Sequence, residues 1–100
     1  MPGSSDAAER LIAEGNRAED AGKLPEACAL YREALRLAPQ SARAHLNLGI
    51  ALQALGDHAG AVARYEQALV LDPANAYAAY NFGKLRYERG AEPGREASAM

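Results

Sequence analysis

Residues 34–49 read ALRLAPQSARAHLNLG, and residues 68–83 read ALVLDPANAYAAYNFG. The two stretches are identical at eight of 16 positions, always at an offset of 34 residues. Self-similarity at a fixed period of roughly 20 to 50 residues is typical of repeat architectures. We therefore expect this chain of 100 residues to be built from copies of one short unit.

The period of 34 residues extends beyond these two stretches and covers most of the chain. The matching positions are Gly15/Gly49/Gly83, Gly22/Gly56/Gly90, Ala27/Ala61, Tyr31/Tyr65, Ala34/Ala68 and Pro39/Pro73. Within one copy, residues 42–55 and residues 58–71 are each rich in helix formers, and short turn-forming sequences separate them. Each copy is therefore predicted to be a helical hairpin.

The predicted helix ends carry residues with a physical reason to be there. Gly56 can adopt the left-handed conformation that ends a helix, and Asp57 can cap the free amides of the next helix. Pro73 prevents the preceding helix from continuing, and Asn75 can cap the helix that follows. The two helices of a unit are thus expected to run antiparallel.

A glycine recurs in the middle of the first predicted helix of each copy, at Gly15, Gly49 and Gly83. A mid-helix glycine costs about 1 kcal/mol relative to alanine, so its recurrence predicts that another group approaches the backbone closely there. Tyr31 and Tyr65 are the expected groups, each lying on the second helix of a hairpin. We predict that each tyrosine ring packs over the glycine of its partner helix.

The remaining core residues of the hairpins are predicted from helical spacing. Leu48, Leu52 and Leu55 recur at intervals of three and four residues and are expected to fill the seam between the helices. His45 lies on the same side as Leu48, so we expect it to pack in the core and not to act as a ligand or base. Cys28, between two alanines, is expected to be a small, partly buried side chain.

A 34-residue helix–turn–helix unit with Leu48-Gly49, Ala61, Tyr65 and a closing Pro73 resembles the tetratricopeptide repeat (TPR). The resemblance implies an all-α fold, a right-handed superhelical solenoid of antiparallel helix hairpins. The expected division is a disordered N-terminal segment (1–6), a TPR-like domain (7–90) with units 8–41, 42–75 and a partial 76–90, and a flexible C-terminal tail (91–100). In that tail, Arg95 stands where Ala61 would predict alanine.

Composition limits the class of function. The net charge is −2 and basic residues alternate with acidic ones, so nucleic acid is not an expected partner. Cys28 is the only cysteine, and His45 and His58 lack the paired spacing of a zinc site, so no disulfide, metal or other cofactor is predicted. The sequence shows no signal peptide, no long apolar run and no catalytic motif, so we expect a cytoplasmic protein that is neither an enzyme nor a membrane protein.

The resemblance also implies an inner groove, lined by the first helix of each unit, that holds a peptide from another protein. Three stripes, each at i, i+4, i+7 and i+11, fall in the same register: Glu9, Ala13, Asn16, Asp20; then Arg43, Asn47, Ile50, Ala54; then Tyr77, Asn81, Lys84, Glu88. The predicted groove residues are Asn16, Arg43, Asn47, Ile50, Tyr77, Asn81 and Lys84.

Two specific roles are considered for these residues. Asn47 and Asn81 occupy equivalent positions, and two side-chain amides could bracket the peptide bonds of an extended ligand, as in the asparagine ladders that they resemble. The alternative is that each is a solvated asparagine on a helix face.

Arg43 and Lys84 could hold a ligand carboxylate, loosely similar to the clamp of chaperone-binding arrays. However, Ile12, Tyr77 and Asn81 stand where that clamp has basic residues. The alternative for the two basic residues is ordinary solvated charge.

The last predicted helix is apolar on more than one face. Tyr77, Tyr80, Phe82 and Tyr87 crowd it, so something is expected to cover it: a second helix, the tail, a second copy or a ligand. The predicted function is a protein–protein interaction module that binds an extended peptide without catalysis. The alternatives are a self-assembly module that forms a homodimer through this helix, and a regulatory appendage of a larger enzyme.

Overall fold

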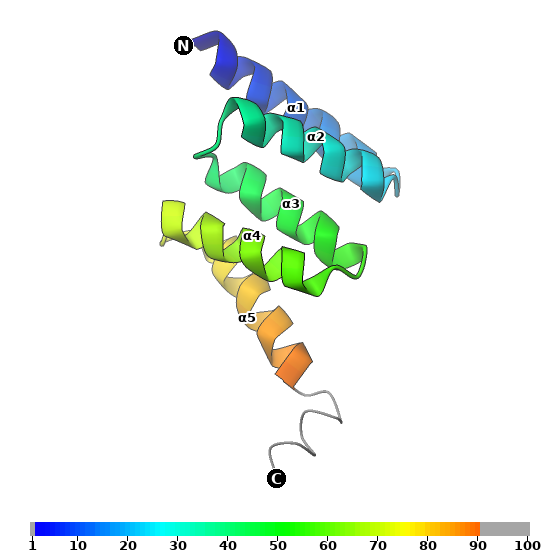
Figure 1. The fold of residues 1–100 in the computed structure, drawn as a ribbon, viewed down its shortest axis with the longest axis vertical. Helices are drawn as coiled ribbons and strands as arrows, with labels where there is room; N and C mark the ends of the chain where they lie inside the picture. Colours follow the sequence, from blue (N-terminus) through cyan, green and yellow to red (C-terminus); the bar gives the residue numbers. More distant parts are fainter. Residues whose placement is uncertain (1, 91–100) are drawn as a thin grey trace.

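Five helices follow one another through residues 2–90, which are the residues that this computed structural model describes. They are α1 (Pro2–Asp20), α2 (Leu24–Leu37), α3 (Ala42–Ala54), α4 (His58–Leu71) and α5 (Ala76–Gly90). The pairs α1/α2 and α3/α4 form two hairpins stacked in a row, and α5 follows at the far end (Figure 1). Residues 2–90 contain no strand, so the predicted all-α row of helical hairpins is confirmed.

The helix ends form as the turn residues predict. Gly22 and Gly56 have φ angles of 78° and 91°, the left-handed region in which a residue with a side chain is strained. Ser41, Asp57 and Asn75 each precede a helix, and each side-chain oxygen accepts a hydrogen bond of 2.9 to 3.1 Å from the backbone N–H three residues later. These caps fix where α3, α4 and α5 begin.

The two tyrosines of the repeat pack over two glycines, as predicted. A Cβ atom added at Gly15 would collide with the ring of Tyr31, and one added at Gly49 would lie 2.7 Å from Cε1 of Tyr65. Both rings are fully buried. Gly83 differs, because an added Cβ there would meet nothing within 4 Å, and no described helix follows α5.

Small residues let the paired helices approach each other. Ala27 and Ala34 of α2 and Ala61 and Ala68 of α4 have no exposed surface, so each buried tyrosine is flanked on its own helix by two buried alanines. The prediction for Leu55 is wrong: its side chain is 47% exposed. Leu55 is the C-cap of α3, where the chain is already turning away from the hairpin seam.

The chain ends differ in how they compare with the prediction. The helical backbone of α1 begins at Pro2, within the segment 1–6 for which disorder was predicted. Proline is well tolerated there because the first helical residues need no amide donor and its φ angle is already suitable. The predicted tail, residues 91–100, lies outside the described residues.

Candidate functional site

The first helices of the three units are neighbours, because α3 contacts both α1 and α5. All residues of their three stripes are exposed or partly buried, so they are accessible from the surface of these helices. Of the predicted groove residues, Asn16 and Asn47 are brought together. Nδ2 of Asn47 donates a long hydrogen bond of 3.4 Å to Oδ1 of Asn16, which links α3 to α1. Both side chains are half-buried, so their amides are held at the surface without being removed from water.

Asn16 is also hydrogen-bonded to the core of the first hairpin. The hydroxyl of the buried Tyr31 lies 2.7 Å from Oδ1 of Asn16 and 2.7 Å from Oε1 of Glu19, so one phenolic proton serves two acceptors. Burial, followed by the hydrogen bond to Glu19, raises the pKa of Tyr31 far above its usual value. Tyr31 therefore stays protonated and fixes the orientation of the Asn16 side chain.

The equivalent contacts in the second hairpin lack the asparagine. Tyr65 donates a hydrogen bond of 2.6 Å to Oε1 of Gln53, and burial raises the pKa of Tyr65 to about 12. The position equivalent to Asn16 is Ile50, a partly buried residue packed against the core. Among the described residues, a core tyrosine is thus bonded to a residue of the predicted groove only in the first unit.

The hydrogen bonds within residues 6–88 leave two polar atoms of this pair without a protein partner: Nδ2 of Asn16 and Oδ1 of Asn47. One is a donor and the other an acceptor. A peptide bond offers the complementary pair, a carbonyl oxygen and an N–H. The linked asparagines can therefore engage the backbone of an extended chain.

Arg43 forms an ion pair with Glu9, which belongs to the first stripe but is not among the predicted groove residues. Its Nη1 lies 2.6 Å from Oε1 of Glu9, and both side chains are more than half exposed. The signal was present in the sequence, because Glu9 and Arg43 have opposite charges at an offset of 34 residues. A pair this exposed contributes about 0 to 1 kcal/mol, so a ligand carboxylate can compete with Glu9 for the guanidinium.

The groove residues on α5 are arranged less tightly. Nδ2 of Asn81 donates a hydrogen bond of 2.7 Å to the carbonyl oxygen of Tyr77 on its own helix, and no hydrogen bond joins it to Asn47 within the described part of the chain. The side chain of Tyr77 is 76% exposed, and Lys84 is exposed beside it. Without a ligand, Asn47 is therefore bonded to Asn16 and Asn81 to its own helix, and the bracketing of a ligand by Asn47 and Asn81 stays a prediction.

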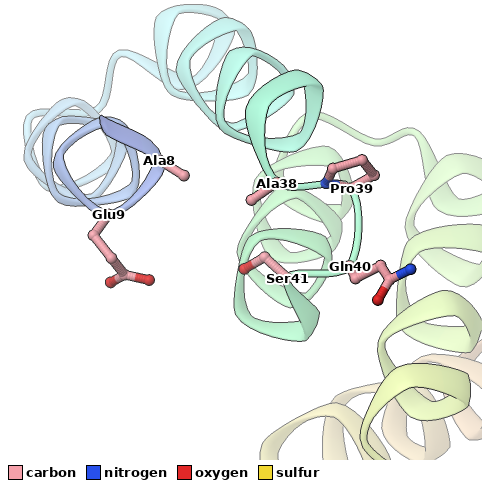
Figure 2. Close-up of a pocket in the computed structure, with 6 residues that line it drawn as sticks. All are labelled: Ala8, Glu9, Ala38, Pro39, Gln40 and Ser41. Carbon is pink, nitrogen blue, oxygen red and sulfur yellow. The ribbon is translucent and has the colours of Figure 1, made fainter. Parts of the chain in front are cut away.

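A pocket of about 520 Å³ opens at one end of this surface, between the start of α1 and the loop that joins α2 to α3. Its lining residues are Ala8, Glu9, Ala38, Pro39, Gln40 and Ser41. Figure 2 shows the methyl groups of Ala8 and Ala38 directed into the space between them, with the Glu9 carboxylate at the rim. An apolar floor with a polar rim suits an apolar ligand side chain. The loop geometry that forms this pocket has no signal in the sequence.

The buried imidazole of His45 has a structural role, as predicted. Its Nε2 donates to the carbonyl oxygen of Pro39 at 3.1 Å, and its Nδ1 accepts from Nη1 of Arg64 at 3.0 Å. Burial lowers the pKa of His45 and the positive charge of Arg64 adds to this, against an opposing effect of the hydrogen bond to Pro39. The ring is therefore held neutral. Cys28 is also buried, and burial raises the pKa of its thiol.

Residues 2–90 contain no group of three or more His, Cys, Asp or Glu side chains placed to hold a metal ion. Over the same range, no helix has both the length and the apolar character needed to cross a bilayer.

Comparisons with known proteins agree with the helical hairpins. A protein-family model described as TPR repeat matches residues 15–56 and 52–90. Among solved structures, 70 chains match, including the crystal structure of the Sgt2 TPR domain from Aspergillus fumigatus. That structure is 31% identical in sequence, with a TM-score of 0.79, over 83% of this chain and 55% of its own, so this chain spans about half of its length. A comparison with curated proteins found no match.

Proposed function

The chain belongs to the tetratricopeptide repeat family, whose members serve as protein–protein interaction modules, and from this premise we propose that it binds an extended peptide segment along α1, α3 and α5. The proposed contact residues are Asn16, Arg43, Asn47, Ile50, Tyr77, Asn81 and Lys84. Recognition needs no catalytic group and no cofactor. It is proposed to take place in the cytoplasm, on helices that are already ordered, so that the ligand bears most of the ordering entropy.

The observation that carries the proposal is the pair Asn16 and Asn47. The two amides are joined across two repeat units and tied to the buried Tyr31, and Nδ2 of Asn16 and Oδ1 of Asn47 are left for a ligand. Because a prearranged amide pair reads the backbone and not the side chains, it holds an extended segment of varied sequence.

The surroundings of this pair indicate what else the segment carries. Arg43, one turn before Asn47 on α3, and Lys84 on α5 are exposed positive charges, and the pocket beside Glu9 suits an apolar side chain. We therefore propose a ligand with an acidic group near an apolar anchor. An affinity on the order of micromolar, about −8 kcal/mol, is ordinary for such a complex.

The test is a proton–nitrogen correlation titration of the labelled chain with pools of short synthetic peptides, half of them ending in a free carboxylate. We expect saturable shifts of the Asn16 and Asn47 side-chain amides. Asn47→Ala is expected to weaken binding by about tenfold, the scale of one lost ligand hydrogen bond. Asn81→Ala is the matched control with the smaller effect, because the Asn81 amide is bound to its own helix.

Two results would contradict the proposal. The first is a titration in which no pool shifts either amide of the pair. The second is a peptide that binds wild type and Asn47→Ala equally, which would place its site elsewhere on the molecule. A free-carboxylate pool that binds no better than the other would remove the acidic part of the proposal alone.

A further inference from the structure

One face of α5 is exposed and combines a bare glycine with two aromatic rings. Tyr80 and Tyr87 are 67% and 77% exposed, and they lie three residues before and four residues after Gly83. With about 100° per residue in a helix, both rings lie within about 60° of Gly83. Ala79 and Arg86 flank Gly83 on the other side and are also exposed. We name these five residues the open face.

The chain itself shows what a glycine at this repeat position accepts. At Gly15 and Gly49 the equivalent space is filled by a buried tyrosine ring from a neighbouring helix, whereas at Gly83 it is empty. The residue 34 positions after Tyr65 is Ala99, which has no ring to offer. The repeat register therefore places no aromatic ring at the third position of the series Tyr31 and Tyr65.

We infer that the open face binds the open face of a second copy of this chain, with the two α5 helices antiparallel and Gly83 at the two-fold axis. In that arrangement, a residue three positions before Gly83 on one helix lies opposite a residue about four positions after Gly83 on the other helix. Tyr80 thus faces the partner's Tyr87, and Tyr87 faces the partner's Tyr80. These are two symmetry-related contacts of the offset kind that aromatic rings prefer. Ala79 faces the partner's Arg86, a small side chain against a large one. The absent side chains at Gly83 let the two backbones approach.

Charge favours the antiparallel arrangement. Residues 76–83 carry no charged side chain, whereas the second half of α5 contains Lys84, Arg86, Glu88 and Arg89. An antiparallel pair places each charged half against an uncharged half, whereas a parallel pair would place the two charged halves, each with a net positive charge, against each other. Arg86 already lies over the ring of Phe82, with its Cζ 5.4 Å from the centroid, so it is held along its own helix.

The inferred dimer leaves the proposed peptide groove free. Tyr77 and Lys84 lie about 120° and about 100° around α5 from Gly83, on the side of the groove stripe. The dimer is expected to be weak, because four tyrosine rings bury roughly 150 to 250 Å² each and the total stays below the roughly 1,200 Å² of a standard interface. We expect a dissociation constant on the order of 100 µM.

Sedimentation equilibrium of the full chain from about 20 µM to about 2 mM tests the inference, because that range brackets the expected constant. The wild type is expected to pass from monomer to dimer. Tyr80→Ser with Tyr87→Ser is expected to remain monomeric throughout. The matched control is Tyr77→Ser, which removes an equally exposed tyrosine from the same helix and is expected to dimerise like the wild type.

Gly83→Leu is the variant that keeps the fold while blocking the interface. A Cβ atom added at Gly83 meets nothing within 4 Å in the monomer, so we expect the hairpins to be undisturbed, whereas a leucine side chain would separate the two backbones in the dimer. We expect dimerisation to weaken by at least about tenfold. A wild type that stays monomeric up to about 2 mM would overturn the inference, as would a Tyr77→Ser variant as impaired as the double variant.

Discussion

The same substitution, glycine to alanine, is expected to have opposite effects at two equivalent positions of the repeat. At Gly49, the new methyl group would lie 2.7 Å from Cε1 and 2.8 Å from Cδ1 of Tyr65 and 3.2 Å from Cβ of Arg64. Carbon atoms prefer a separation of roughly 3.5 to 4.0 Å, so the ring would have to move by nearly 1 Å. Tyr65 is fully buried and its hydroxyl is hydrogen-bonded, so it has no free space to move into.

The expected magnitude follows from two opposing terms. Overpacking a well-filled core costs about 1 to 3 kcal/mol, and replacing a mid-helix glycine by alanine returns about 1 kcal/mol. Because the methyl group would overlap a fully buried ring by nearly 1 Å, the overpacking cost lies in the upper part of this range, about 2 to 3 kcal/mol, and Gly49→Ala should lower the free energy of unfolding by about 1 to 2 kcal/mol. At Gly83 the first term is absent, because the new methyl group meets nothing within 4 Å, so Gly83→Ala should stabilise α5 by about 1 kcal/mol.

The assay is urea unfolding followed by far-ultraviolet circular dichroism, at a protein concentration of about 5 µM, where the proposed dimer is dissociated. Amide hydrogen exchange of α5 adds a local readout for Gly83→Ala, because terminal repeats can open before the rest of the array. If Gly49→Ala were as stable as the wild type, the tyrosine would not be tightly packed over that glycine. If Gly83→Ala were destabilised to the same extent as Gly49→Ala, some group would have to cover Gly83 in the monomer.

Two further predictions concern buried polar groups. Because the pKa of His45 is lower in the folded chain than in the unfolded chain, stability is fully present above the unfolded pKa of about 6.5 and is lost as pH falls towards the folded pKa. The urea concentration at the unfolding midpoint should therefore decrease as the pH is lowered from about 7 to about 5. His45→Gln, whose amide can donate and accept without titrating, should reduce this pH dependence. If the variant shows the same pH dependence as the wild type, other titrating groups cause it. Tyr31→Phe and Tyr65→Phe should each lower the free energy of unfolding by about 0.5 to 1.5 kcal/mol, the scale of one buried hydrogen bond. Only Tyr31→Phe should shift and broaden the side-chain amide signals of Asn16 in a proton–nitrogen spectrum. If both variants affect these signals equally, Tyr31 does not orient the Asn16 side chain.

The sequence predicted those features of the fold that repeat. Tyr31 over Gly15 and Tyr65 over Gly49 could be expected because a costly glycine and a large ring recur together, and one physical reason accounts for both. Leu55 was wrongly placed in the core because helical spacing alone does not show where a helix ends. Residues at cap positions follow the turn and not the helical period.

The side-chain contacts within the candidate site could not be predicted from the sequence, for a different reason. Spacing placed Asn47 and Asn81 at equivalent positions, but a side-chain amide chooses its partner by local distance. Asn81 reaches a carbonyl of its own helix, while Asn47 finds Asn16 instead. The support given to Asn16 by Tyr31 joins a first helix to a second helix across 15 residues, a spacing with no general pattern.

The hydrogen bonds of His45 couple the two hairpins to each other. Pro39 ends the first repeat unit, while His45 and Arg64 belong to the two helices of the second, so one imidazole ties three segments together. In an array of repeats, cooperativity depends on how strongly neighbouring units are coupled relative to the stability of each unit alone. When the chain is stretched from its two ends, both hairpins should therefore unfold together in a single event. In His45→Ala, the two hairpins should unfold in two separate events.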